Sequence, residues 1–165
     1  MKRIIFACCL FAVAAVQAQL PDHIYDPNIR TVKLYRYGDV YGYPVMMLNS
    51  GDQLELHFDD MEGGIKNYYY AFQLCNADWT PANVQLYDYI KGFQSTRITN
   101  YRNSNIANTR YTHYQAILPD RYSTTPVKAG NYLLKVFLND DTSKLAFTRR
   151  LLIVNKKAAV SAQVT

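Results

Sequence analysis

Few side chains in this sequence have the types and the spacing that catalysis or metal binding requires. The three histidines, His23, His57 and His113, do not show metal-ligand spacing among themselves. His57 and Asp59 are two residues apart, so on a strand they would share one face and could hold a common ligand. The polar outer face of an antiparallel strand has the same pattern and is much commoner. That simpler interpretation is the one we adopt for this pair.

The remaining polar motifs are better explained by turns. Asp59-Asp60 and Asp140-Asp141 resemble fragments of calcium-binding loops, but both lack the D-x-D-x-D-G spacing of those loops. Gly63-Gly64 precedes neither a helix nor a G-x-x-x-x-G-K motif, so it indicates a turn and not a phosphate-binding loop. No serine lies in a G-x-S-x-G nucleophile elbow. We therefore expect a protein that is not an enzyme, with no metal site and no cofactor.

Tyrosine is the unusual component of this chain. Of 165 residues, 15 are tyrosine, against seven phenylalanines and one tryptophan, and only 19% of the residues are charged. Four tyrosines crowd one turn that contains two glycines: Tyr35, Tyr37, Tyr41 and Tyr43. Such a turn could hardly bury all four rings, and exposed tyrosines give a large contact area at a low cost in side-chain entropy. This turn is thus a candidate contact surface, suited to another protein or to stacking against a sugar.

The N-terminal residues have the pattern of a secretory signal peptide. The basic pair Lys2-Arg3 is followed by an apolar run from Ile4 to Val16, and small residues at Val16 and Ala18 precede Gln19. The apolar run is shorter than the roughly 20 residues that a membrane-spanning helix needs. We expect residues 1–18 to be removed by cleavage between Ala18 and Gln19. No later segment is long and apolar enough to cross a membrane.

Removal of the signal peptide changes the cysteine count and the charge. Cys8 and Cys9 are lost, so Cys75 remains alone and cannot form an internal disulfide. A lone thiol in an oxidising compartment is safest when it is buried as a small apolar side chain, which is what we expect of Cys75. Loss of Lys2 and Arg3 lowers the formal charge from +5 to +3. The remaining charges form no basic stripe, so nucleic acid is not expected as a partner.

Apolar and polar residues alternate along the rest of the chain with the period of two that is typical of β-strands. With 49% hydrophobic residues the chain can bury a core, which excludes intrinsic disorder. Residues rich in Gly, Pro, Asn and Asp separate the alternating segments. The pattern predicts an all-β, immunoglobulin-like antiparallel β-sandwich of about seven strands. The expected strands are Thr31–Tyr35, Pro44–Leu48, Leu54–Phe58, Tyr68–Cys75, Tyr111–Leu118, Asn131–Leu138 and Phe147–Val154.

One expected strand carries an aromatic stripe, and one connection is unusually long. In Tyr68–Cys75 the aromatic residues at alternate positions, Tyr68, Tyr70 and Phe72, would form a stripe facing the core. The connection 76–110 is long, and long connections are usually functional or disordered. Several large side chains within it argue against disorder, because they could hold the connection on the body of the domain. These are Tyr87, Tyr89, Ile90, Phe93 and Ile98.

Several motifs, in order, resemble a known family. They lie in Phe58–Trp79 (FDDMEGGIKNYYYAFQLCNADW), Tyr87–Phe93 (YDYIKGF), Ser104–Asp120, Ala129–Phe137 and Leu145–Val154. Together, from about Ile24 to the end of the chain, they are similar to the N-terminal domain of the type IX secretion system plug protein. We assign residues 19–157 to this domain. The residues that match the family pattern are interpreted as determinants of the fold. They are Phe58, Asp59, Asp60, Cys75, Asp78, Trp79, Asn108, Thr109, Gly130, Asn131 and Tyr132.

The resemblance implies a function that needs no catalysis. It implies a periplasmic protein of Bacteroidota-type bacteria, peripheral to the outer membrane, that caps the periplasmic mouth of a large outer-membrane translocon barrel. Family members are longer, so residues 158–165, which alternate like the start of a strand, are interpreted as the beginning of a missing or truncated β region. Two other functions stay open. One is a secreted carbohydrate-binding module that uses the tyrosine turn, and the other is an accessory domain of a secreted hydrolase, which would need a catalytic partner.

Overall fold

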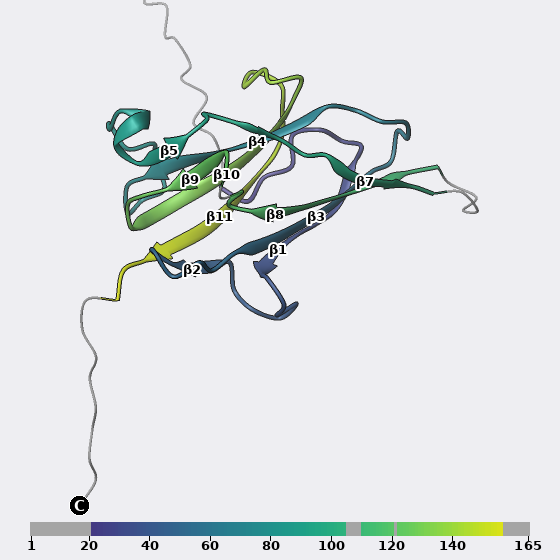
Figure 1. Ribbon diagram of the computed structural model, residues 1–165. Helices are drawn as coiled ribbons and strands as arrows, with labels where there is room; N and C mark the ends of the chain where they lie inside the picture. The colour runs from purple at the N-terminus through teal and green to yellow at the C-terminus, as the bar shows by residue number, and fades with distance from the viewer. Residues whose placement is uncertain (1–20, 105–109, 121, 157–165) are drawn as a thin grey trace, which may run out of the picture.

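The computed structural model describes residues 21–104, 110–120 and 122–156, which contain eleven strands and one short 3-10 helix (Figure 1). In chain order these are β1 (Ile29–Arg36), β2 (Val45–Met47), β3 (Leu54–Asp60), β4 (Tyr68–Cys75), the 3-10 helix η1 (Leu86–Asp88), β5 (Ile90–Gly92), β6 (Thr96–Arg97), β7 (Asn100–Asn103), β8 (Thr112–Leu118), β9 (Thr124–Pro126), β10 (Gly130–Leu138) and β11 (Leu145–Val154). The expected signal peptide with its cleavage site at Ala18 and Gln19, the motif residues Asn108 and Thr109, and residues 158–165 lie outside the described residues.

The strands form two main sheets and one small sheet. A four-stranded sheet has the order β1-β3-β8-β7, and a five-stranded sheet has the order β2-β11-β10-β4-β6. The pair β5-β9 forms the third sheet. Neighbouring strands are antiparallel except β2, which pairs in parallel with β11. Buried side chains from both main sheets meet in one hydrophobic cluster, so the all-β sandwich expected from the sequence is confirmed.

All seven segments expected to be strands are strands in the structure. β3 illustrates why, since Leu54, Leu56 and Phe58 have 0% exposure while the residues between them are half-buried. In β4 the stripe of Tyr68 and Tyr70 faces the core as expected. Alternation of this kind places every second side chain between the sheets, where burial of apolar area stabilises the fold.

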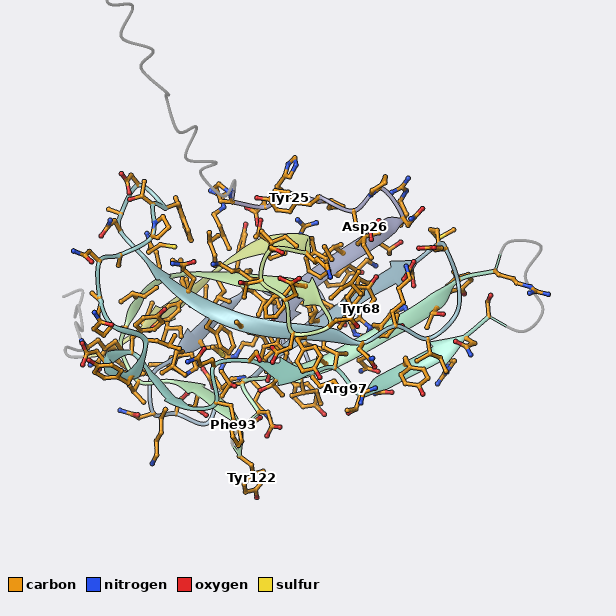
Figure 2. All side chains as sticks on the ribbon, turned by 90° about the horizontal axis from the view of Figure 1, so that it is seen from above. Tyr25, Asp26, Tyr68, Phe93, Arg97 and Tyr122 are labelled. Carbon is orange, nitrogen blue, oxygen red and sulfur yellow. The ribbon has the colours of Figure 1, made fainter. Side chains whose placement is uncertain are left out.

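Aromatic rings fill much of the core, which accounts for a large part of the tyrosine content. The Phe58 ring stacks on Tyr114 with centroids 5.0 Å apart, and it meets Tyr68 and Phe147 edge to face at the same separation. Tyr68 lies near the middle of the molecule in Figure 2. Such edge-to-face and stacked pairs add to the free energy gained by burying the rings.

The described residues 76–104 of the long connection contain η1, β5, β6 and β7, which the sequence did not predict as regular structure. Tyr89, Ile90 and Ile98 are buried and hold it on the body, as expected, whereas Tyr87 and Phe93 are exposed. β7 has four exposed residues and no apolar face. It is a strand because its backbone pairs with β8, at the end of the molecule opposite η1 and β5 (Figure 1). Within the described part of the chain, no helix is long and apolar enough to cross a membrane.

Candidate partner-binding surface

The connection between β1 and β2 presents the tyrosines that the sequence marked as a contact surface. Tyr41 is 97% exposed, Tyr43 is 83% exposed and Tyr37 is 54% exposed. Hydrogen bonds from the backbone of Asp39 to Arg36 and from Gly42 to Asp39, both 2.9 Å long, hold the turn. The turn therefore leaves most of Tyr41 and Tyr43, and about half of Tyr37, exposed to solvent.

Tyr35 does not belong to that surface, which corrects the expectation for this residue. Its exposure is 9%, and its ring stacks on His57 with centroids 5.7 Å apart. Burial is the main cause that raises the pKa of the Tyr35 phenol. The charge of Glu55 and a hydrogen bond to Glu55 raise it further. Tyr35 is opposite Glu55 on β3, and the His57 side chain of the same strand covers its ring.

Tyr43, one of the exposed tyrosines, lines a groove that the sequence did not reveal. Tyr43, Trp79 and Leu152 line a hollow of about 360 Å³ together with Asp22 and Arg150. The Arg150 guanidinium lies over the Trp79 ring, 5.2 Å from its centroid. The Asp22 carboxylate accepts hydrogen bonds from the Arg150 backbone N–H, at 2.8 Å, and from its side chain. We call these five residues the Trp79 groove.

A tight turn after β4 positions Trp79 in this groove. Trp79 has a φ of 67°, a left-handed conformation that is unfavourable for a bulky residue. The turn is held by Asp78, whose Oδ1 accepts hydrogen bonds from the Thr80 backbone at 3.0 Å and from the Thr80 hydroxyl at 2.6 Å. The Asn76 N–H also donates to the Thr80 carbonyl at 2.8 Å. Asp78 thus fixes the turn, while Trp79 reaches across to Arg150 on β11.

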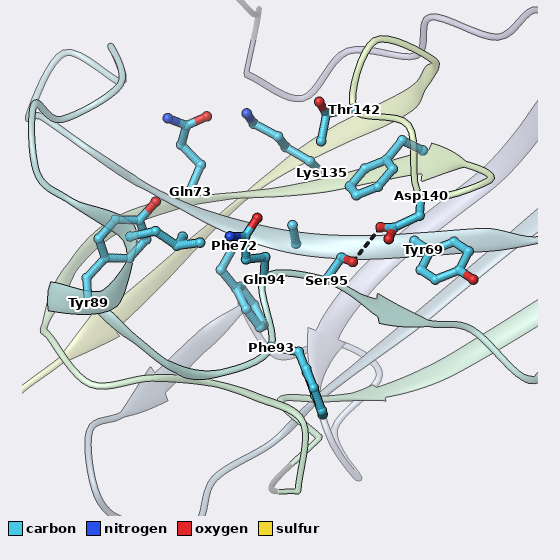
Figure 3. A pocket seen from close by; sticks show the side chains of 13 residues that line it. Tyr69, Phe72, Gln73, Tyr89, Phe93, Gln94, Ser95, Lys135, Asp140 and Thr142 are labelled. Carbon is cyan, nitrogen blue, oxygen red and sulfur yellow. Dashed lines mark hydrogen bonds between the residues drawn. The ribbon is translucent and has the colours of Figure 1, made fainter.

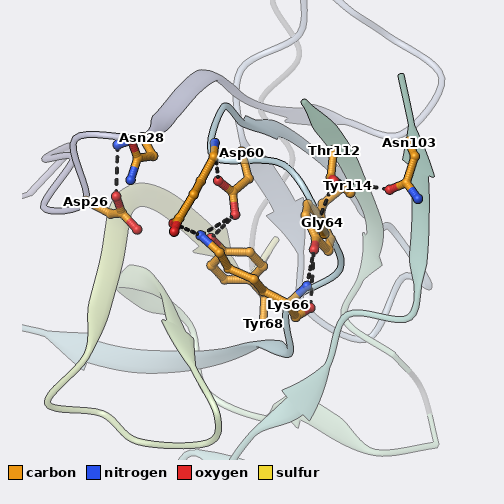
Figure 4. A network of polar contacts seen from close by, with 10 residues as sticks. Asp26, Asn28, Asp60, Gly64, Lys66, Tyr68, Asn103, Thr112 and Tyr114 are labelled. Atoms are coloured by element: carbon orange, nitrogen blue, oxygen red, sulfur yellow. Dashed lines mark hydrogen bonds and ion pairs between the residues drawn. The ribbon is translucent and has the colours of Figure 1, made fainter. Parts of the chain in front are cut away.

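Two residues of β3 that match the family pattern, Phe58 and Asp60, have separate structural roles. Phe58 is in the core, and Asp60 is buried at 0% exposure at the end of the strand. The Asp60 carboxylate accepts a hydrogen bond from the Tyr68 hydroxyl at 2.9 Å and pairs with the Lys66 ammonium at 2.8 Å (Figure 4). Burial and the neighbouring Asp60 raise the pKa of Tyr68, so that its hydroxyl remains a donor. These contacts tie β3, β4 and the turn between them together.

Cys75 and the residues at the start of β10 also serve the fold. Cys75 is buried, as expected, and burial raises the pKa of its thiol. A side-chain carbon on Gly130 would lie 3.0 Å from Leu74, so the strand entry fits closely against β4. The Asn131 side chain donates to the Asn76 carbonyl at 3.2 Å, and the buried Tyr132 hydroxyl donates to a backbone carbonyl at 2.9 Å. These contacts join the start of β10 to β4 and to the turn that follows β4.

His57 and Asp59 are linked through a residue from a different strand. His57 Nδ1 lies 3.0 Å from Nε2 of His113 on β8, and His113 Nδ1 lies 2.6 Å from Asp59 Oδ1. The other nitrogen of His57 contacts Glu55 at 3.0 Å. The polar face thus consists of imidazoles and carboxylates that satisfy one another. Among the described residues, no group of three or more His, Cys, Asp or Glu side chains could hold a metal ion.

Comparison with known proteins places this geometry in a family. Residues 29–155 match the family model described as "Type 9 secretion system plug protein 1st domain". Among solved structures, the crystal structure of a hypothetical protein from Parabacteroides merdae is similar, with a TM-score of 0.77 and 29% sequence identity. The match covers 84% of this chain but only 34% of that chain, so this chain spans about a third of that protein's length. No curated protein sequence matches the chain.

Proposed function

Since the chain belongs to the family of the first domain of type 9 secretion system plug proteins, we propose that it binds the outer-membrane channel of that system from the periplasmic side and caps it without catalysis. A periplasmic location and export by the signal peptide follow from this role. The expected partner is the large translocon barrel, and the contact would be between folded protein surfaces.

The observation that supports this proposal is the pairing of the exposed tyrosine turn with the Trp79 groove. Tyr43 is 83% exposed and lines the groove with the stacked Trp79 and Arg150, and Tyr41, 97% exposed, lies two residues before it on the same turn. Tyrosine, tryptophan and arginine contribute most of the binding free energy at protein interfaces. Rings fixed on a hydrogen-bonded turn also lose little conformational entropy when a partner covers them.

Co-purification from the native envelope tests the proposal. We expect the tagged protein to recover a large outer-membrane barrel from detergent extracts, identified by mass spectrometry, and the double variant Tyr41→Ala/Tyr43→Ala to recover much less. Tyr87→Ala is the matched control, because Tyr87 is 78% exposed but lies in η1, outside the groove. Absence of the barrel from the wild-type sample would contradict the proposed function. Equal losses for the control and the double variant would contradict the role of the turn.

A carbohydrate-binding function is the second candidate, and the groove gives it a specific basis. Tyr43 and Trp79 provide aromatic surface, and Asp22 and Arg150 provide hydrogen-bonding groups in the same hollow. Sugar binding sites combine the two kinds of group. Migration through a polysaccharide affinity gel tests it: Tyr41→Ala or Tyr43→Ala should reduce retention, and unchanged migration of both variants would exclude the turn as a sugar platform.

A further inference from the structure

A second hollow lies on the outer face of the five-stranded sheet and shares no lining residue with the Trp79 groove. Its volume is about 630 Å³, within the range of ligand-binding pockets. Tyr69 and Gln73 of β4 and Lys135 of β10 line it from the sheet, and Tyr89 and Phe93 line it from the segment that contains β5 (Figure 3). We call this hollow the Lys135 trough.

The ammonium group of Lys135 is the unusual feature of the trough. Lys135 is opposite Ala71 on β4 and Thr148 on β11, and its neighbours on the same face of β10, Leu133 and Phe137, have 0% exposure. Its stem is therefore set among covered apolar groups, and burial lowers the pKa of the ammonium. The Lys135 ammonium forms no hydrogen bond or ion pair with any residue that the structure describes.

Two other lysines of the domain, unlike Lys135, form ion pairs with carboxylates. Lys66 is 22% exposed and pairs with two carboxylates, Asp60 and Glu62, while the exposed Lys144 pairs with Asp141. The Asp140 carboxylate also lines the trough, where its Oδ1 accepts a hydrogen bond of 2.5 Å from the Ser95 hydroxyl, but it forms no ion pair with Lys135 (Figure 3). Taking a charge partly out of water without a counter-ion is unfavourable. The trough therefore offers a cation whose charge an incoming anion would balance.

The side chains that line the trough indicate which groups of a ligand would lie next to the bound anion. The Phe93 ring is 67% exposed, and in Figure 2 it projects away from the body on the same side as Tyr122. The amides of Gln73 and Gln94 also line the trough and can donate to and accept from a peptide backbone. The combination of cation, aromatic wall and amide groups matches an acidic residue next to an apolar one in a polypeptide.

We propose that the Lys135 trough binds an acidic side chain of a partner polypeptide, with its carboxylate on the Lys135 ammonium and an adjacent apolar side chain on Phe93. The ion pair would form in a partly desolvated site, where it is stronger than on an open surface. This assignment does not depend on the capping role, because the trough and the Trp79 groove are separate.

An NMR titration with two matched peptides tests the assignment. The probes are acetyl-Phe-Glu-amide and acetyl-Phe-Gln-amide, which differ in one carboxylate, and the readout is the ε-methylene resonance of Lys135. We expect the Glu peptide to shift this resonance and to bind about tenfold more tightly than the Gln peptide. In Lys135→Gln the preference should disappear. In Phe93→Ser both peptides should bind more weakly while the preference for Glu remains.

Two further measurements complete the test. Lys91→Gln, which removes an exposed lysine of β5 outside the trough, should leave the preference unchanged, and acetate alone should bind much more weakly than the Glu peptide. Equal affinities of the wild type for the two peptides would overturn the proposal, and so would a preference that survives in Lys135→Gln. Acetate binding as tight as that of the Glu peptide would overturn the assignment to a polypeptide.

Discussion

Gly92 and Ser123 lie so close together that position 92 has room only for glycine. A side-chain carbon on Gly92 would lie 1.9 Å from the Ser123 carbonyl oxygen. That oxygen accepts a hydrogen bond of 2.5 Å from the backbone of Phe93, and Gly92 has a φ of 95°. This contact joins the end of β5 to the start of β9 and sets the direction of Phe93. The Gly-Phe of the family motif is thus explained by a close backbone approach.

Gly92→Ala should destabilise the domain by about 3 kcal/mol, because it adds a steric clash to an unfavourable left-handed backbone. Urea unfolding gives the free energy of unfolding. Gly64→Ala is the control, since Gly64 has a similar φ of 78° but no atom within 4 Å of the added carbon. It should cost about 1 kcal/mol. Equal losses in the two variants would mean that the Ser123 carbonyl does not restrict position 92.

Lys66→Met should reduce the free energy of unfolding by about 3 kcal/mol, because it leaves the buried Asp60 carboxylate without its counter-ion. Lys66 is only 22% exposed, and Asp60 has 0% exposure. Lys144→Met, which breaks the exposed pair with Asp141, should cost less than about 1 kcal/mol. Chemical denaturation of both variants is the measurement. A loss for Lys66→Met as small as that for Lys144→Met would contradict the importance of the buried pair.

Asp52 should make the stability of the domain depend on pH in the acidic range. The Met47 backbone N–H donates to its carboxylate at 3.0 Å and Arg36 pairs with it at 3.1 Å, so its pKa is held below the usual value. A carboxyl group whose pKa is lowered by folding stabilises the protein at pH values above its pKa in the unfolded chain, about 3.9. That contribution is lost as the pH falls through its pKa in the folded protein.

Asp52→Asn should therefore be less stable than the wild type near neutral pH, and the difference should shrink below about pH 4. Thermal unfolding of both proteins between pH 7 and pH 3 measures this difference. Asp88→Asn serves as the control, because the Asp88 side chain has no hydrogen bond or ion pair with a described residue. A difference between wild type and Asp52→Asn that stays constant down to pH 3 would argue against this origin.

Cys75 should be protected from thiol reagents in the folded protein. Its exposure is 7%, and burial raises the pKa of the thiol, which lowers the fraction of reactive thiolate. Alkylation by iodoacetamide, followed by mass spectrometry of the peptide that contains Cys75, should be about a hundredfold slower or more than in urea. Asn83 is exposed, so the added cysteine of the variant Asn83→Cys should react freely. Comparable rates at positions 75 and 83 would show that the β4 end opens readily.

Local patterns in the sequence predicted the long strands and the short β2, but not the short strands β5, β6, β7 and β9. Alternation in Leu54–Phe58 is visible without any partner strand, because one face must be apolar wherever the sheet is buried. The four residues Asn100–Asn103 carry no such pattern. They are a strand because Gln115 and Tyr114 on β8 supply a paired backbone. A pairing that depends on a partner elsewhere in the chain leaves no local signature.

The sequence by itself determined the all-β sandwich, the aromatic core and the family, because these follow from periodicity and from motifs read in order. Only the tertiary structure decided which distant side chains meet. It packed the Tyr35 ring against His57 of β3, brought Trp79 to Arg150 and left Lys135 without an acidic partner among the described residues. The physical reason is that strand order and register set these contacts, and both depend on the packing of the whole core and not on any one segment.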